Sequence, residues 1–344
     1  MCEVLPFTYL SLRCTCWCVV NMKMEETILS DMHVRATSGT TSYTWLVPAC
    51  VAGDDCISSC AVDADGDVAV KRRRRSRCLQ LAHSKDGTSL ADVGLQIWRG
   101  ALLLCDYLIL HAERFRGPAS ELVVLEMGSG CGLCSLMAAQ LGARLVYATD
   151  VGDSVLHNLS ANVDANGLHD VRVRAFDWCL PWVPGDWRED AAAASSYNWR
   201  ASDRAALSHP QRVMILAADV VYDDDLTSAF IVRLADVIRW MQSRAEEEGS
   251  AAREVMAVVA IERRLNFVLD SLSTRAPAAE HFEALLATAL KAGGAMAALR
   301  LDEPPLSALP QAMEYERCPQ LRLYELSLPP AVGAGACGRT KRAC

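Results

Sequence analysis

Apolar positions along the chain become regular from about residue 95 onward. Between residues 95 and 109 they recur every three or four positions, which predicts an amphipathic helix that ends at Gly117-Pro118. A continuous apolar run at 122–125 follows, then the glycine-rich sequence EMGSGCGL, then an apolar stretch of helical length at 134–141. This order predicts a strand, a glycine turn and a helix.

The same alternation continues to residue 262. It predicts strands at 145–148, 171–176, 213–217 and 255–261, and helices at 154–166, 226–242 and 279–292. Such alternation indicates a parallel sheet covered on both faces, because right-handed crossovers leave neither face exposed. Two strand-like segments without a helix between them, 296–301 and 321–328, predict an antiparallel pair that closes the sheet.

The remaining parts of the chain are less regular. Residues 31–92 combine strand-like pieces at 43–47 and 68–70 with Gly and Asp turns, and we expect a smaller, irregular and peripheral N-terminal region. Residues 184–211 are polar, Ala-rich and without a pattern, which predicts an inserted loop. We expect disordered extensions at 1–30 and 331–344, so that 93–330 forms the main domain.

Composition and charge narrow the function. The 344 residues have a net charge of −8 and are 51% hydrophobic, which is typical of a globular chain. The basic run KRRRRSR at 71–77 is isolated, so the rest of the chain is more acidic than the whole. We therefore expect no direct nucleic-acid binding and favour a basic protein partner. The run itself indicates either nuclear import or a solvated charged segment, and we expect the protein in the nucleus, the cytoplasm or both.

Cysteine usage and the amino end exclude other classes. The 15 cysteines are odd in number and lack paired zinc-ligand spacing, so we expect free thiols in a reducing compartment and no metal site. Residues 4–20 are apolar, but they contain Arg13 and lack a basic start. They are also shorter than the ~20 apolar residues that span a bilayer, so no membrane partner is expected.

The glycine turn is the first candidate for binding chemistry. In an open parallel sheet, ligands bind at the carboxyl ends of the strands, and here the first turn reads Glu126-x-Gly128-x-Gly130-x-Gly132. Its spacing differs from the GxGxxG of nicotinamide sites. A carboxylate at Glu126 would repel a pyrophosphate but suits a ligand with an amino group and a sulfonium. The turn therefore favours S-adenosylmethionine as cofactor, and a purely structural turn is the alternative.

The other predicted strands also end in acidic residues. Asp150 is placed to bind the ribose hydroxyls of an adenosine cofactor, with a helix N-cap as the alternative. Asp177 can accept a hydrogen bond from an adenine amino group while Trp178 covers the base, although a Trp there is often part of a core. Asp219 and Tyr222 follow the central strand, where a methyl donor would point.

Three neighbouring features have ordinary explanations. The acidic run 223–225 predicts charges that complement the dipole of the following helix, and not metal ligands. Glu262 ends the fifth strand and either lines the opposite wall of the site or forms a salt bridge with Arg263 or Arg264. Cys131-x-x-Cys134 has redox spacing, but a thioredoxin-type motif does not lie inside a cofactor turn.

Six motifs together resemble one known family. VGLQIWRGALLLCDY, EMGSGCGL, YATDVG, FDW, AADVVYDDDLTSAF and AIERRLNFVL are similar to the seven-β-strand protein lysine methyltransferases of methyltransferase family 16. The similarity covers about residues 93–328, and DDDLTSAF with ERRLNF is specific to one branch of that family. The resemblance implies an α/β fold with a Rossmann-like, doubly wound, seven-stranded sheet, mostly parallel with a terminal antiparallel pair, and S-adenosylmethionine as cofactor.

The resemblance also implies roles for individual residues. It places next to the cofactor the residues Trp98, Gly128, Ser129, Gly130, Asp150, Trp178 and Ala218. Asp219 to Tyr222 match an acidic-x-x-aromatic motif that binds the target lysine in the family. The chain departs from the family at Cys131, Cys134 and 184–211, which leaves the choice of substrate open.

We therefore expect a methyltransferase that modifies a lysine side chain of a protein. Asp219 would hold the incoming ammonium and Tyr222 would line its approach channel, while a lowered lysine pKa supplies the neutral nucleophile. Two alternatives remain open at this point. One is a non-catalytic protein that binds S-adenosylmethionine, and the other is a nicotinamide-dependent reductase.

Overall fold

The computed structural model describes most of the chain between residues 28 and 328. The described residues are 28–32, 39–48, 57–62, 68–72, 76–115, 122–182, 196–208, 210, 212–247, 254–268 and 272–328. Of the predicted extension 1–30, only 28–30 are described, and the predicted tail 331–344 lies outside these ranges.

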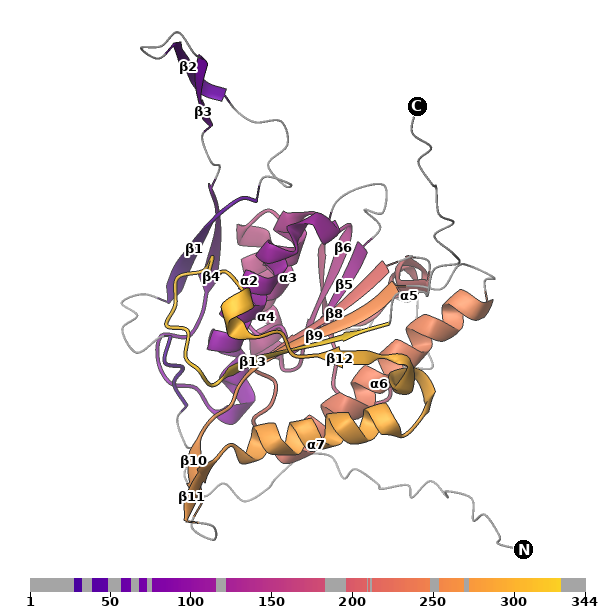
Figure 1. Ribbon diagram of the computed structural model, residues 1–344. Helices are drawn as coiled ribbons and strands as arrows, with labels where there is room; N and C mark the ends of the chain where they lie inside the picture. The colour runs from indigo at the N-terminus through magenta and orange to yellow at the C-terminus, as the bar shows by residue number, and fades with distance from the viewer. Residues whose placement is uncertain are drawn as a thin grey trace, which may run out of the picture.

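A seven-stranded sheet forms the centre of the molecule (Figure 1), with the strand order β12-β13-β9-β8-β5-β6-β7. Its strands are β5 (Leu122–Met127), β6 (Leu145–Asp150), β7 (Val171–Ala175), β8 (Arg212–Ala218), β9 (Glu254–Glu262), β12 (Arg300–Asp302) and β13 (Leu321–Ser327). The strands from β7 to β9 are parallel, and β13 runs antiparallel to both β9 and β12. The predicted sheet, mostly parallel with a terminal antiparallel pair, is confirmed.

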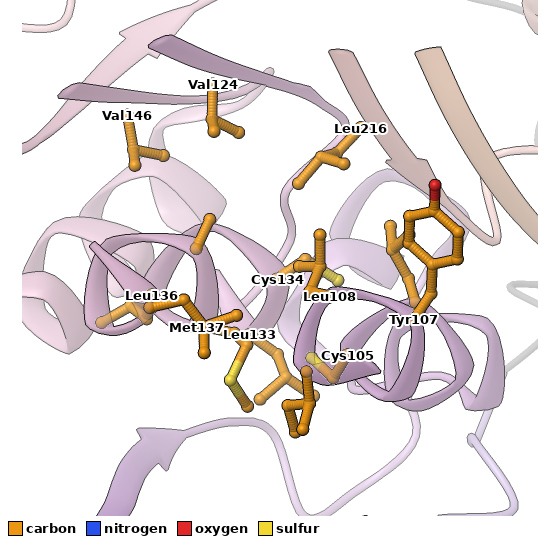
Figure 2. Packing of buried hydrophobic residues seen from close by; sticks show 14 of the residues in the cluster. Cys105, Tyr107, Leu108, Val124, Leu133, Cys134, Leu136, Met137, Val146 and Leu216 are labelled. Atoms are coloured by element: carbon orange, nitrogen blue, oxygen red, sulfur yellow. The ribbon is translucent and has the colours of Figure 1, made fainter. Parts of the chain in front are cut away.

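Helices cover both faces of this sheet (Figure 1). The first face carries α2 (Arg99–Leu110), α3 (Leu133–Leu141) and α4 (Asp153–Ala165), and the second carries α6 (Asp224–Glu247) and α7 (Pro277–Lys291). Because successive side chains of a strand point to opposite faces, Val124 packs with the first set and Val123 with the second. Figure 2 shows Val124, Val146 and Leu216 of the sheet above side chains of α2 and α3.

Helix α2 is central to this packing. The segment Leu90–Leu110 is apolar and long enough to cross a membrane by composition alone, yet nine of the 12 residues of α2 are buried in the core. The helix predicted from residue 95 begins only at Arg99. Gln96 and Trp98 are extended, and a short 3-10 helix, η1 (Leu90–Leu95), precedes them.

The N-terminal region is less peripheral than predicted. Strands β1 (Thr40–Leu46) and β4 (Ser76–Ala82) form an antiparallel ribbon whose buried side chains, among them Trp45 and Leu81, join the core beneath α3 and α4. The side-chain amides of Asn162 on α4 and of Asn166, the C-cap of α4, exchange hydrogen bonds of 2.7–3.0 Å with the backbone of β4. These contacts join residues more than 75 positions apart in the sequence, so a local pattern could not predict them.

A second ribbon, β2 (Ile57–Val62) with β3 (Val68–Arg72), lies away from the sheet in Figure 1. The basic run 71–77 ends β3 and begins β4, and its residues 73–75 lie outside the described part of the chain. The remaining elements are η2 (Ala112–Phe115), the hairpin β10 (Asn266–Val268) and β11 (Ser273–Arg275), η3 (Gly294–Ala298) and η4 (Leu306–Ala308).

Part of the predicted loop 184–211 is helical. Helix α5 (Ala201–Ser208) carries Asp203, whose buried carboxylate accepts hydrogen bonds from Arg172 (2.8 Å) and Arg174 (2.6 Å) of β7. The Tyr197 carbonyl accepts a hydrogen bond of 2.8 Å from Ala175 N–H. The segment therefore covers the edge of the sheet through contacts that are not local in sequence, while residues 183–195 lie outside the described ranges.

Candidate active site

The glycine turn links β5 to α3 at the carboxyl edge of the sheet. Gly128, Gly130 and Gly132 have φ values of +77°, +51° and +92°, a region that residues with a side chain rarely adopt. Backbone N–H groups of Gly128 and Ser129 donate to Thr149 O at 3.0 and 2.8 Å, and Ser129 Oγ accepts from Thr149 N–H at 3.0 Å. The turn is therefore fixed against β6.

The turn also leaves no room for a side chain. A Cβ atom at Gly128 would lie 2.9 Å from Val220 and 3.3 Å from the Trp178 ring, and one at Gly130 would lie 2.9 Å from Gly94 O of η1. The backbone of Gly128 thus packs against Val220, which follows β8, and Trp178, which follows β7. Two sequence-predicted positions, Gly128 and Trp178, are in contact here.

Glu126 lies beneath the turn with only 1% of its surface exposed. Its Oε2 accepts hydrogen bonds from Ser135 N–H (2.8 Å) and from Ser135 Oγ, at the start of α3. Burial raises the pKa of the Glu126 carboxyl to about 7, although the Ser135 bonds oppose that shift. The carboxylate therefore fixes the start of α3 relative to β5, and its contact with the amino group of a cofactor stays a prediction.

Asp150 ends β6 beside the turn. Its Oδ2 accepts a hydrogen bond of 2.7 Å from Gly130 N–H, and its Oδ1 accepts one of 2.7 Å from Val151 N–H. Burial raises the pKa of Asp150 to about 6. Helix α4 has Gly152 as its N-cap and receives no side-chain cap, so the alternative that Asp150 caps this helix is wrong.

Tyr222 lies within electrostatic range of Asp150. Burial, together with the negative charges of Asp150 and Asp223, raises the pKa of Tyr222 to about 12. Asp223 itself caps α6, because Leu226 N–H donates to its Oδ1 at 2.8 Å. The predicted helix-start role is thereby confirmed for Asp223. Tyr222 lies between β8 and α6, and it is close enough to Asp150, at the end of β6, for that charge to affect its pKa.

Trp178 and Asp177 diverge after β7. Trp178 is 8% exposed, and its ring centroid lies 5.2 Å from that of Phe230 on α6. Its buried Nε1–H has no hydrogen-bond partner in the described part of the chain. Asp177 is exposed, and its Oδ1 accepts from Cys179 N–H at 2.8 Å. Trp178 is thus part of the site, while the Asp177 side chain folds back onto its own turn.

Asp219 follows the half-buried Ala218 at the end of β8 and adopts a φ of +52°, which is rare for a residue with a side chain. Its Oδ2 accepts a hydrogen bond of 2.5 Å from Gly100 N–H, and its Oδ1 accepts one of 2.8 Å from Glu262 N–H. Burial raises its pKa, although these two bonds and the Arg264 charge oppose the shift. Asp219 therefore joins the start of α2 to the ends of β8 and β9, a role that the sequence did not predict.

A small cavity, which we call the mouth, lies beside this junction. It has a volume of about 170 Å³ and is lined by residues 28–31 together with Trp98, Arg99, Glu262 and Arg264. Glu262 pairs with Arg99 at 2.9 Å, and Arg263 pairs with Glu283 at 3.6 Å. The predicted salt bridge between Glu262 and Arg263 or Arg264 is therefore wrong, and Glu262 lines the wall of a cavity.

Sequence reasoning missed the part of the mouth that precedes η1. Ser30 N–H donates to Gln96 Oε1 at 2.5 Å, and Gln96 Nε2 donates to Ile28 O at 2.7 Å, so this amide pairs with the backbone like a neighbouring strand. Trp98, predicted to lie by the cofactor, donates its Nε1–H to Val93 O at 3.2 Å and faces the mouth. In the sequence, the one sign of this contact is that Gln96 is a polar residue between the apolar Leu95 and Ile97.

Comparisons with known proteins find relatives of this chain. Residues 78–244 match the family described as lysine methyltransferase. The chain carries a domain of the lysine methyltransferase family. Methyltransferase-like protein 22 of Mus musculus is 34% identical over 250 residues, covering 71% of this chain and 58% of that protein, and the Homo sapiens protein is 34% identical over 256 residues, covering 71% and 56%. The chain thus spans a little more than half the length of these curated relatives.

More distant relatives carry related names. Protein-lysine methyltransferase METTL21E of Mus musculus is 28% identical over 180 residues, covering 49% of this chain and 63% of that protein. Among solved structures, a SAM-dependent methyltransferase from Aquifex aeolicus aligns with 67% of this chain and 91% of its own, at 12% identity and a TM-score of 0.35.

S-adenosylmethionine is the cofactor that the sequence predicts, and the described residues fit it. The glycine turn has its backbone at positive φ at the carboxyl edge of the sheet, with Val220 and Trp178 packed closely against Gly128. Asp150 offers carboxylate oxygens suited to ribose hydroxyls, and the buried Nε1–H of Trp178 lacks a hydrogen-bond partner among the described residues. These three groups come from the ends of β5, β6 and β7.

The two cysteines of the turn are inert thiols. Cys131 and Cys134 are 2% and 1% exposed, and burial raises the pKa of both well above the usual thiol value. Their thiols lie against backbone oxygens, Cys131 at 3.5 Å from Gly94 O and Cys134 at 3.4 Å from Ala101 O. Because the thiolate is the reactive form, this environment argues against redox chemistry at the turn.

Proposed function

We propose that this chain is a protein-lysine N-methyltransferase. The observation that carries the proposal is the meeting of β5, β6 and β8 at one edge of the sheet. Val220 packs against the bare backbone of Gly128, and Tyr222 lies within the field of Asp150. The segment from Asp219 to Tyr222 thereby adjoins the cofactor residues. The relatives named as protein-lysine methyltransferases support a lysine target.

The residues on the cofactor side bind and orient. When bound, S-adenosylmethionine supplies an electrophilic methyl group for in-line displacement by a neutral amine. Asp150 holds hydroxyls through its ionised carboxylate, and Trp178 covers one side of the turn next to Gly128. Gly130 N–H, already bonded to Asp150, keeps that carboxylate in place before any ligand arrives.

The residues on the acceptor side prepare the amine. Tyr222 excludes water with its ring and stays a neutral phenol at physiological pH, because its pKa is about 12. Each oxygen of the Asp219 carboxylate can accept more than one hydrogen bond, so both can still accept from an incoming ammonium group. Burial at this junction favours the neutral form of a lysine, against the opposing effect of the Asp219 carboxylate, and the neutral amine is the nucleophile.

We also propose a basic protein as substrate and a location in the nucleus, the cytoplasm or both. The acidic balance of the chain outside residues 71–77 supports the first, and the isolated basic run supports the second. A tagged chain in which this run is changed to serine should lose nuclear accumulation. Unchanged nuclear accumulation of that variant would contradict the import role.

A labelled methyl donor tests the enzymatic proposal. The full chain is incubated with methyl-labelled S-adenosylmethionine and cell extract, and the labelled protein is hydrolysed to identify the methylated amino acid. We expect methyl-lysine, and no label with a Gly128→Ala variant. Label on another side chain would contradict the lysine assignment. Retention of the donor without transfer would indicate a binding protein, and selective retention of NAD would indicate a reductase.

A further inference from the structure

The mouth holds more negative charge than its inner arginine can balance. Arg99 Nη1 lies 2.9 Å from both Asp31 Oδ2 and Glu262 Oε1, so one guanidinium serves two carboxylates. The Arg99 side chain is only 16% exposed, which makes this pairing the fixed part of the mouth. Two carboxylates and one guanidinium leave one negative charge, and this charge attracts a second cation.

Arg264 supplies that second cation. Its guanidinium carbon lies 4.6 Å from the centroid of the Trp98 ring, within the range of a cation–π contact, and both residues line the mouth with Glu262. Arg264 is exposed and, among the residues that the structure describes, it has no hydrogen bond and no ion pair. Arg99 is therefore held by two carboxylates, whereas Arg264 is held by one aromatic face and is free to exchange.

The position of Arg264 relates this second cation to the acceptor side of the site. It follows Glu262 by two residues, and Glu262 N–H donates to Asp219 Oδ1 at 2.8 Å. The positive charge of Arg264 is also close enough to oppose the rise in the pKa of Asp219. A cation of the protein thus lies within electrostatic range of the carboxylate that the proposed function assigns to the target lysine.

We propose that Arg264 is an internal competitor of the substrate lysine, because its guanidinium occupies the aromatic and acidic mouth between Trp98 and Glu262 that the lysine ammonium enters. The lysine displaces Arg264 toward solvent and takes over its contact with the Trp98 ring. A guanidinium suits the competing role because it stacks on an aromatic ring and stays protonated, so it is not itself a nucleophile at neutral pH. This inference rests on the proposed function.

Titration with a small peptide tests the competition. The probe is an N-acetylated, C-amidated pentapeptide with one lysine among alanines, added to the ¹⁵N-labelled full chain with S-adenosylhomocysteine. The indole N–H resonance of Trp98, assigned with Trp98→Phe, reports binding at the mouth. We expect Arg264→Gln to bind the probe about two- to fivefold more tightly, since it removes a cation–π competitor at an exposed site. Arg264→Lys should bind as the unchanged chain does.

Matched controls separate competition from bulk charge. Arg239→Gln removes the same charge from an exposed arginine of α6 that pairs with Asp236 at 2.9 Å, and it should leave the affinity unchanged. The same peptide with norleucine in place of lysine should not shift the Trp98 resonance. Equal or weaker binding by Arg264→Gln, or an equal gain by Arg239→Gln, would overturn the inference.

The two proposals can fail separately. If lysine is methylated in the extract but Arg264→Gln binds the probe no better, only the competitor role is wrong. If Arg264→Gln binds the lysine peptide more tightly but no methyl-lysine forms, the mouth still takes a cation and the proposed function is wrong.

Discussion

The two halves of the candidate site are built in different ways. In the half formed by the glycine turn and Asp150, the key hydrogen bond joins Gly130 to Asp150, only 20 positions apart. In the half formed by the mouth and Asp219, the bonds from Gly100 to Asp219 and from Arg99 to Glu262 join residues 119 and 163 positions apart. The cofactor half is therefore a property of one strand-turn-helix-strand segment, whereas the acceptor half exists only after the whole sheet has assembled.

The halves also use different physical means. The turn depends on glycines at positive φ, so an added side chain would disturb it by steric clash. The mouth depends on charges and side-chain amides, namely Arg99 with its two carboxylates and Gln96 with the backbone of residues 28–30. Substitutions should therefore separate cofactor affinity from methyl transfer, and the following predictions proceed from the largest expected effect to the smallest.

Gly128→Ala should weaken binding of S-adenosylhomocysteine by more than about a hundredfold. The new Cβ atom would lie 2.9 Å from Val220 in a backbone that already disfavours a side chain. Titration calorimetry measures the affinity. Gly167→Ala is the matched control, because Gly167 has a φ of +64° and no described atom lies within 4 Å of the position that its Cβ would take. It should cost only about 1–2 kcal/mol of stability and leave affinity intact. Equal losses of affinity in both variants would mean that backbone strain, and not the contact with Val220, causes the effect.

Asp219→Asn should lower methyl transfer by about a hundredfold, equal to about 2.7 kcal/mol of transition-state stabilisation, with cofactor affinity near normal. Both Asp219 oxygens accept backbone N–H bonds, so the new amide turns an NH₂ group toward one of these donors. We therefore also expect a loss of about 1–3 kcal/mol in unfolding free energy. Affinity, turnover and denaturant unfolding are measured on one preparation.

Asp223→Asn is the control for that prediction. Asp223 caps α6 through a single oxygen, and Asn is an equally good N-cap, so stability should change by only a few tenths of a kcal/mol. Full activity of Asp219→Asn would remove Asp219 from the mechanism. A parallel loss of cofactor affinity would show that the two halves of the site are not independent.

The affinity for S-adenosylhomocysteine should fall about tenfold per pH unit below pH 6. Burial raises the pKa of Asp150 to about 6 in the unliganded protein, and only the ionised carboxylate accepts two hydroxyl bonds. Above pH 6 the Asp150 carboxyl is ionised and the affinity is at its maximum. Below pH 6 the carboxyl must lose a proton before the ligand binds, so the affinity falls. Asp150→Asn should abolish the slope. Glu126→Gln should retain the pH dependence of the affinity. If the pH dependence is lost in Glu126→Gln and kept in Asp150→Asn, Glu126 and not Asp150 is the titrating group.

Gln96→Ala should free residues 28–30 without affecting the cofactor half. The amide makes three hydrogen bonds, with Ser30 N–H, Ile28 O and Thr88 Oγ1, and their loss should lower stability by about 1 kcal/mol. Hydrogen exchange at the Ser30 amide should quicken while cofactor affinity stays constant. Gln311→Ala, whose amide bonds only within its own loop, should leave Ser30 protected. A fall in cofactor affinity in Gln96→Ala would contradict the separation.

Local patterns in the sequence are enough to predict the central sheet and the glycine turn. Buried parallel strands are continuous apolar runs and their helices are amphipathic, so both can be predicted from local periodicity. Gly128, Gly130 and Asp150 lie in one continuous segment of the chain. The N-cap Asp223 likewise bonds to a residue only three positions away.

Tertiary structure alone decided the acceptor half and the edges of the sheet. The carboxylate of Asp219 bonds to Gly100 and Glu262, Gln96 pairs with Ser30, and Asp203 draws α5 onto β7. Each of these contacts satisfies a polar group that burial would otherwise leave unpaired, and its partner is chosen by proximity in the folded chain. Local patterns report which residues are buried, but the partner of a buried polar group is set only when distant segments meet.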